Sequence, residues 1–204
     1  MTRFLNLIEV GLLMKKEVLV IVAHPDDETI WMGGTLLQNK WNITIVSLCR
    51  KDDADRAPKF MKVCENYNAT CFMSDLEDDS LEDVELREVV DRIRSLISRT
   101  KYDYIFTHGE NGEYGHKRHI DVHNAVKFMI ENGMLGCDKL FFFSYSRRGA
   151  HCYAKKSSDK FIRLQSTDLV KKKNLIKQVY GFDENSFEER CCKKVEAFNL
   201  VKIR

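Results

Sequence analysis

The chain of 204 residues is 44% hydrophobic and 31% charged, which is the length and composition of one globular domain. Basic residues exceed acidic ones by only two, so the chain carries no strong electrostatic footprint for nucleic acid. The short basic runs at residues 171–173 and 193–194 are interpreted as solvated faces of helices. We therefore expect no nucleic-acid partner.

Seven cysteines form no C-x-x-C pair and leave an odd one over, which favours the reducing cytoplasm over a disulfide-bonded secreted protein. The apolar stretch at residues 4–14 contains Glu9 and is shorter than the roughly 18 residues of a membrane span, so neither secretion nor membrane insertion is expected. Met14 lies just before the first expected strand. Residues 1–13 are therefore interpreted as an N-terminal extension and residues 14–204 as the domain.

Short apolar runs and amphipathic stretches alternate along the chain. The apolar runs predict strands at residues 18–22, 43–48, 70–73, 102–107 and 140–145. Helices are expected between them at residues 28–39 and 59–67, from a cap at Ser80 through residue 97, and from about residue 116 to residue 132. The last third predicts a strand at 159–165, a helix at 167–179 and a terminal helix at 183–198. This alternation predicts an α/β fold, a Rossmann-like three-layer single domain around a mostly parallel sheet.

A histidine and three carboxylates follow the first expected strand in the sequence AHPDDE at residues 23–28. Ligands of parallel α/β sheets collect outside the carboxyl ends of the strands, and carboxylates crowded in a cleft repel one another unless a cation is bound. Because Asp26 and Asp27 are adjacent and point in different directions, one of them can bind a metal ion while the other stays free. Glu28 is interpreted as a first-turn helix residue that braces this loop.

Four of the six histidines follow the fourth expected strand, at positions 108, 116, 119 and 123. They are expected at the same end of the sheet as His24. His116 and His119 are three residues apart and share a helix face, whereas His123 is expected to face solvent or to lie behind the ligands. With one aspartate, these residues provide what a hydrolytic zinc site requires: three ligands, an open position for water and a separate base.

The two motifs together resemble the paired signature of the LmbE/PIG-L family of zinc-dependent N-acetylglucosaminyl deacetylases. The first motif is AHPDDE at residues 23–28, and the second is YGHKRH at residues 114–119. Lys117 and Arg118 stand where the family often has proline and an acidic or amide residue. The resemblance extends from about Val18 to Val126, so it implies the family's fold and activity for most of the chain.

The resemblance implies a role for each matched residue. His24, Asp27 and His119 would bind zinc, Asp26 would be the general base, and His116 would stabilise the oxyanion. A zinc ion bound there would polarise the acetyl carbonyl and lower the pKa of a bound water to about 7.

Three further residues are candidates for the site. Tyr114 could share the oxyanion role of His116. Arg56 is the best match for an arginine that contacts the sugar in the family, although Lys59 replaces the acidic residue that commonly follows. His108 is a candidate for lining the substrate pocket.

The leading interpretation is a cytoplasmic hydrolase that removes the acetyl group from an N-acetylglucosamine-type sugar or conjugate. An amidase acting on another small N-acyl compound would use the same chemistry. A catalytically silent metal- or sugar-binding module is the non-enzymatic alternative, and the intact Asp26 argues against it. Nitrogen and oxygen ligands also admit another divalent transition metal. Because the chain is short for the family, a second copy could complete the pocket, and a homo-oligomer is one expectation.

Overall fold

The computed structural model describes residues 15–201, so the extension expected at residues 1–13 lies outside the described residues. Seven strands form one sheet in the order β3-β2-β1-β4-β5-β9-β8. The first five are parallel, and β9 and β8 are each antiparallel to their neighbours. The strands are β1 Glu17–Val22, β2 Asn42–Ser47, β3 Ala69–Met73, β4 Lys101–Thr107, β5 Gly136–Phe143, β8 Lys160–Arg163 and β9 Val195–Val201.

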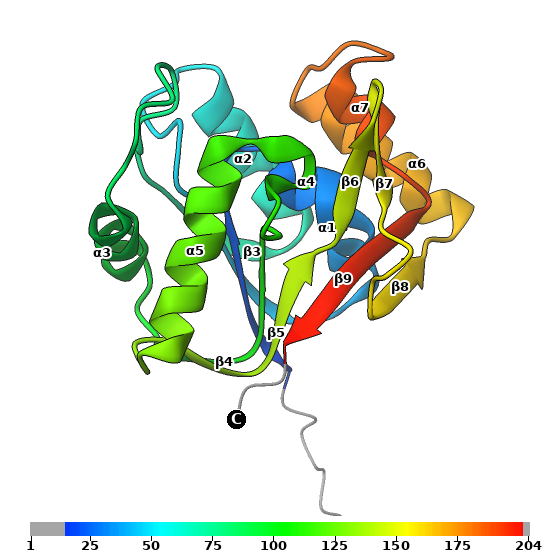
Figure 1. The fold of residues 1–204 in the computed structure, drawn as a ribbon. Helices are drawn as coiled ribbons and strands as arrows, with labels where there is room; N and C mark the ends of the chain where they lie inside the picture. The colour runs from blue at the N-terminus through cyan, green and yellow to red at the C-terminus, as the bar shows by residue number, and fades with distance from the viewer. Residues whose placement is uncertain (1–14, 202–204) are drawn as a thin grey trace, which may run out of the picture.

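Helices cover both faces of this sheet and give it three layers (Figure 1). One face is covered by α1 (Asp27–Gln38), α2 (Arg56–Asn66), α6 (Ser166–Asn174) and the π-helical turn η1 (Leu175–Val179). The other face is covered by α3 (Leu86–Leu96) and α5 (Lys117–Glu131). Residues 18–22 of β1 are fully buried because both faces of the strand are covered, which is why they form an unbroken apolar run. The α/β fold with a mostly parallel sheet is as predicted.

The C-terminal third differs from the prediction. The terminal helix expected at residues 183–198 is wrong, because only α7 (Phe187–Cys191) is helical and Val195–Val201 forms β9 inside the sheet. Strand β9 is held in the sheet by its pairing with β5 and β8. The charged residues near it have a helix-like pattern and give no sign of this pairing. A hairpin of β6 (Tyr145–Arg148) and β7 (His151–Ala154) was also not predicted.

Two further local predictions are corrected by the structure. The third helix begins at Leu86 rather than near Ser80, whose backbone N–H donates to Glu77 Oε1 within an irregular segment. The basic run at 171–173 is not wholly solvated, because Lys172 is fully buried with its Nζ 2.6 Å from Glu196 Oε1. The second run, at residues 193–194, lies between α7 and β9 rather than on a helix.

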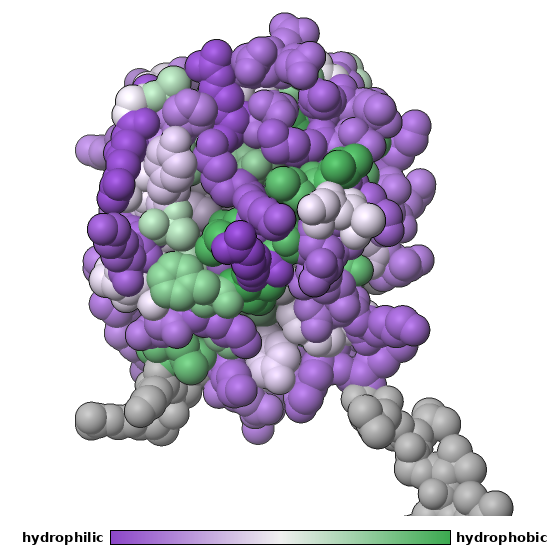
Figure 2. All heavy atoms as spheres, turned by 90° about the vertical axis from the view of Figure 1, so that its right-hand side faces the viewer, coloured by the Kyte–Doolittle hydropathy of each residue, from purple (hydrophilic) through white to green (hydrophobic). Residues whose placement is uncertain are grey.

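The antiparallel edge of the sheet is protected by charged side chains. Figure 2 shows the side of the molecule that carries α6 and β8, where a mostly hydrophilic surface is interrupted by apolar side chains. Lys160 of β8 extends over the ring of Phe141, with its Nζ 5.9 Å from the ring centroid. Lysines on an edge strand hinder pairing with another chain. No helix within residues 15–201 is long and apolar enough to cross a membrane.

Candidate active site

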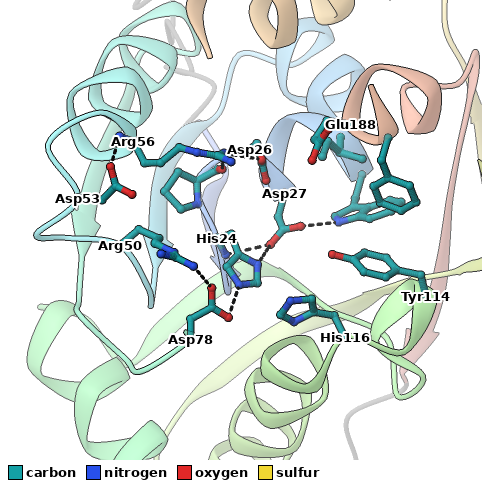
Figure 3. Close-up of a pocket in the computed structure, with 14 residues that line it drawn as sticks. His24, Asp26, Asp27, Arg50, Asp53, Arg56, Asp78, Tyr114, His116 and Glu188 are labelled. Atoms are coloured by element: carbon teal, nitrogen blue, oxygen red, sulfur yellow. Dashed lines mark hydrogen bonds and ion pairs between the residues drawn. The ribbon is translucent and has the colours of Figure 1, made fainter. Parts of the chain in front are cut away.

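The strand order reverses between β1 and β4, which are neighbours in the sheet while the chain continues outward from each in opposite directions. Open α/β sheets bind ligands at such a switch point, outside the carboxyl ends of the strands. A cavity of about 300 Å³ lies there (Figure 3). It is lined by His24, Pro25, Asp26, Asp27, Ile30, Trp31, Arg50, Asp53, Arg56, Asp78, Tyr114, His116, Phe187 and Glu188.

Three side chains from the two sequence motifs converge beside this cavity. His24 Nδ1 lies 3.2 Å from Asp27 Oδ2 and 3.2 Å from His119 Nε2. The third side, from His119 Nε2 to Asp27 Oδ2, is also 3.2 Å. The three atoms therefore form an equilateral triangle, although His24 and His119 are separated by 95 positions in the chain.

The outer nitrogen of each histidine is held by a carboxylate. His24 Nε2 lies 3.0 Å from Asp78 Oδ1, and His119 Nδ1 lies 2.6 Å from Glu113 Oε2. When the outer nitrogens donate to these carboxylates, the inner nitrogens of the neutral rings carry lone pairs that face each other and Asp27. Three hydrogen-bond acceptors this close together repel one another unless a cation, either a proton or a metal ion, lies between or beside them.

The spacing and chemistry of this triangle fit a divalent metal ion. Donor atoms bound tetrahedrally at about 2.0–2.1 Å are about 3.3 Å apart, close to the separations observed here. A carboxylate behind each ligand histidine is also the usual arrangement in zinc sites, because it fixes the tautomer and orients the ring. The residues present therefore fit the metal ion that the two motifs imply.

The protonation equilibria of the triangle show the same demand for positive charge. Burial would lower the pKa of His119, but the nearby Asp27 carboxylate outweighs it and raises the pKa to about 9. Burial would also lower the pKa of His24, but hydrogen bonds to Asp27 and Asp78 outweigh it and raise the pKa well above its ordinary value. Burial would raise the pKa of Asp27, yet the nearby His119 holds it well below its usual range. A bound metal ion would supply the positive charge that protons otherwise provide.

His108 lies behind the site and not in the cavity, which corrects its expected role as a substrate contact. Its ring is fully buried, and its Nε2 accepts the backbone N–H of Ala23 at 2.9 Å. Its Nδ1 therefore carries the proton and donates to Glu113 Oε2 at 2.8 Å. Because the Nε2 lone pair is occupied, His108 serves to fix Glu113 and through it His119. His123 is buried as well, with Nδ1 2.9 Å from the carbonyl oxygen of His108, so it does not face solvent.

Asp26 lines the cavity but takes no part in the triangle. Its backbone has φ 117° and ψ −30°, a conformation that side chains rarely adopt and that persists only where the surroundings enforce it. Its carboxylate accepts from Arg56 Nη1 at 3.0 Å. Burial and the neighbouring Asp27 raise the pKa of Asp26 well above its ordinary value. The strained backbone thus points a basic carboxylate away from the triangle and into the cavity.

Glu28 braces this strained loop, as the sequence predicts. It is fully buried and accepts from the backbone N–H of Asp26 at 3.1 Å, the hydroxyl of Thr29 at 2.6 Å and that of Tyr180 at 2.8 Å. Burial raises its pKa to about 7 against the effect of these donors. Glu28 therefore holds the backbone of Asp26 in its strained conformation.

Tyr114 and His116 form the wall opposite Asp26. Both come from the turn around the short helix α4 (Gly112–Gly115), where Glu113 has a positive φ of 58°. Burial and the neighbours His119 and His24 lower the pKa of His116 to about 4, so its ring is neutral at pH 7. Burial and Asp27 raise the pKa of Tyr114, which keeps its hydroxyl protonated. Both side chains can therefore act as neutral hydrogen-bond donors toward the cavity.

The remaining cavity residues divide into one that was predicted and several that were not. Arg56 lines the cavity, pairs with Asp26 and places its guanidinium carbon 4.5 Å from the ring centroid of Phe182. Sequence reasoning missed the lining residues Asp78, Arg50, Phe187 and Glu188, and also Glu113, which is buried behind the triangle. Glu113 stood in the glycine-rich turn before the histidines, which was the one signal that could have identified it.

Comparisons with known proteins show the family and the fold of the chain. Residues 19–130, more than half of the chain, match the family model PIG-L, described as GlcNAc-PI de-N-acetylase. Uncharacterized protein L374 of Acanthamoeba polyphaga mimivirus is 25% identical over 179 residues, which cover 78% of this chain and 76% of that protein. A solved structure of a deacetylase triple mutant (Orf2*T) of the teicoplanin biosynthetic pathway aligns with a TM-score of 0.63. That alignment covers 91% of this chain and 98% of the other at 13% identity, and it shows a common fold.

Proposed function

Because this chain belongs to the PIG-L family, we propose that it is a metal-dependent N-deacetylase. Its substrate would be an N-acetylglucosamine-type sugar or a conjugate of one, and its products would be acetate and the free amine. The observation that carries the proposal is the triangle of donor atoms from His24, Asp27 and His119, with the unligated carboxylate of Asp26 beside it. This is the ligand set of a hydrolytic site, which needs three protein ligands and a separate base.

The residues around the cavity divide the reaction between them. A divalent metal ion, when bound, polarises the amide carbonyl and makes water more acidic. Asp26 takes the proton from the attacking water as the water oxygen bonds to the carbonyl carbon, and it then returns a proton to the nitrogen as the C–N bond breaks. His116 and Tyr114 donate hydrogen bonds to the oxyanion that develops on the carbonyl oxygen. One well-placed donor of this kind is worth about 3 to 4 kcal/mol of transition-state stabilisation.

We propose zinc as the metal, since two imidazoles and one carboxylate are ligands that zinc commonly takes. Iron or another divalent transition metal also binds such a set, and cellular supply then decides which metal is present. The cytoplasm is the proposed compartment, supported by the odd number of cysteines and the lack of a C-x-x-C pair in the sequence.

The test combines turnover with metal content. Purified protein loaded with zinc should release acetate from N-acetylglucosamine compounds, whereas Asp26→Asn should retain the metal and lose at least about 100-fold in rate, the contribution of a general base. Asp53→Asn is a matched control, because Asp53 also lines the cavity but accepts only backbone N–H groups of its own loop. Equal turnover by Asp26→Asn would remove Asp26 as the base. Acetylated sugars that stay inert while other N-acyl amides react would support the amidase alternative instead.

A further inference from the structure

We propose that Arg118 is a positioning residue for the metal site: it holds the loop that carries Asp78, so that the Asp78 carboxylate meets the outer nitrogen of His24. The inference rests on the metal site of the proposed function, and it assigns a role to a residue of the second motif that departs from the family pattern. It is carried by the burial of Arg118, by its partners on the loop, and by the lack of backbone hydrogen bonds within that loop.

The carboxylate that holds His24 comes from an irregular segment. Asp78 lies between β3 and α3. Within the described residues 15–201, residues 77–84 make no backbone–backbone hydrogen bond. Leu81 in this segment has a positive φ of 52°, a conformation that such residues keep only where the surroundings enforce it. The position of Asp78 therefore depends on side chains that reach the segment from other elements.

Arg118 joins this segment to α5. Its side chain is fully buried, and it donates from Nε to the backbone carbonyl of Glu77 and from Nη2 to the Glu77 carboxylate. Its Nη1 donates to Asp121 Oδ2 at 2.9 Å, further along α5. A buried guanidinium needs partners for its charge and its N–H groups, and these partners fix its position. Because Glu77 directly precedes Asp78, Arg118 fixes the backbone next to Asp78.

The Asp78 carboxylate then bridges two side chains at the site. Its Oδ1 lies 3.0 Å from His24 Nε2, and its Oδ2 accepts from Arg50 Nη2 at 2.8 Å (Figure 3). Arg50 binds carboxylates of this segment, whereas Arg118 binds its backbone. A carboxylate behind a ligand histidine fixes the tautomer and orients the ring, so its position affects the affinity for the metal ion.

Lys117, the other residue that departs from the family pattern, reaches the same segment. Its Nζ donates to the carbonyl oxygen of Leu81 at 2.6 Å. The side chain of Lys117 is 35% exposed while that of Arg118 is fully buried, so the contacts of Arg118 are less screened by water. Arg118 directly precedes His119. The two residues between the motif's histidines thus bind the loop that supports His24 to the helix that carries His119.

The experiment measures the zinc affinity of the full chain by competition with a chelator. Arg118→Met retains an unbranched side chain but removes the donors, and we expect a zinc affinity about tenfold lower, within the range for groups behind ligand histidines. In an Asp78→Asn background, where the carboxylate is already lost, Arg118→Met should lower the affinity by less than about twofold further. An effect that does not pass through Asp78 would lower the affinity by the same factor in both backgrounds.

Three further variants separate positioning from a general loss of stability. Lys172→Met breaks the buried pair with Glu196 away from the cavity and should leave the zinc affinity unchanged, and an equal loss there would overturn the inference. Glu77→Ala tests the same contact in a protein that keeps the buried guanidinium, because the Glu77 side chain is 42% exposed. We expect it to lower the affinity about threefold, the size of one partly exposed ion pair. Asp83→Ala, which removes a fully exposed carboxylate of the same segment, should have no effect.

The outcomes separate this inference from the proposed function. Acetate release by the parent, with an unchanged zinc affinity in Arg118→Met and Glu77→Ala, would overturn the inference and leave the deacetylase intact. A loss by the same factor with and without the Asp78 carboxylate would also overturn it. A loss that depends on Asp78, in a parent that releases no acetate, would support the inference and contradict the deacetylase proposal. If the parent binds no zinc, both fail.

Discussion

Glu113 Oε2 lies 2.6 Å from His119 Nδ1, in a position with no exposure to solvent. The same oxygen lies 2.8 Å from Nδ1 of His108, and the other carboxylate oxygen accepts the backbone N–H of Gly109 at 2.7 Å. One buried carboxylate thus fixes the ring of a proposed metal ligand, the ring behind it and the loop that joins them. Burial would raise the pKa of Glu113, but the nearby His108 and His119 outweigh it and lower the pKa to about 2.

Replacing this carboxylate should weaken metal binding without altering any ligand. Glu113→Gln keeps the size of the side chain, but its amide group cannot accept from all three donors. We expect a metal affinity about 10- to 100-fold lower, as for other carboxylates behind ligand histidines, measured by competition with a chelator. Glu110→Gln, an exposed neighbour, is the control. An unchanged affinity in Glu113→Gln would mean that the ring of His119 needs no support from this carboxylate.

Metal binding should raise the thermal stability of the protein. A ligand that binds only the folded state at 100 times its Kd contributes about 2.7 kcal/mol, which for a chain of this size corresponds to a rise in Tm of roughly 5–10 °C. Asp27→Asn replaces the anionic donor of the triangle with a neutral amide and should abolish most of this rise. The comparison is made within each variant, with and without zinc, so any loss of stability of the metal-free protein cancels. Asp91→Asn, on the surface of α3, should behave as the parent, and a full rise in Asp27→Asn would argue that zinc binds elsewhere.

The buried pair of Lys172 and Glu196 should be important for stability and not for chemistry. Glu196 accepts from Lys172 Nζ at 2.6 Å and from the backbone N–H groups of Gly34 and Thr35, so it ties β9 and α6 to α1. Lys172→Met leaves a buried carboxylate without its counter-charge, and such changes cost about 3–5 kcal/mol. Urea unfolding should show this loss, whereas Lys171→Met on the exposed side should change the free energy of unfolding by less than about 0.5 kcal/mol. A small effect in Lys172→Met would show that Gly34 and Thr35 satisfy Glu196 by themselves.

Much of the fold was predictable because its central elements are determined locally. Residues 18–22 are apolar without interruption since β1 is covered on both faces, and α3 has its apolar side chains at helical spacing. Strand β9 was mistaken for a helix for the opposite reason. Its Glu196 is buried and charged, and its partner Lys172 lies 24 positions away on α6. Pairing at that distance leaves no periodic pattern in the strand itself.

The residues of the candidate site divide in the same way: those in a local motif were predicted, and those that depend on distant contacts were not. His24, Asp26 and Asp27 lie within four consecutive residues that follow a buried strand, so their location was evident from the sequence. Asp78 was not identified, because it comes from an irregular loop 54 positions from His24 and is one acidic residue among several. Glu113 was part of the recognised turn, but only the folded structure places its carboxylate between His108 and His119.

The most direct test of the account is the metal content of the purified protein after dialysis against zinc and then against metal-free buffer. We predict about one zinc ion per chain in the parent and in His151→Ala, whose histidine lies on the β6–β7 hairpin away from the cavity. We predict almost none in the double variant His24→Ala/His119→Ala. Retention of one zinc ion per chain by that double variant, or no zinc in the parent, would contradict the central claim that these two histidines hold a catalytic metal with Asp27.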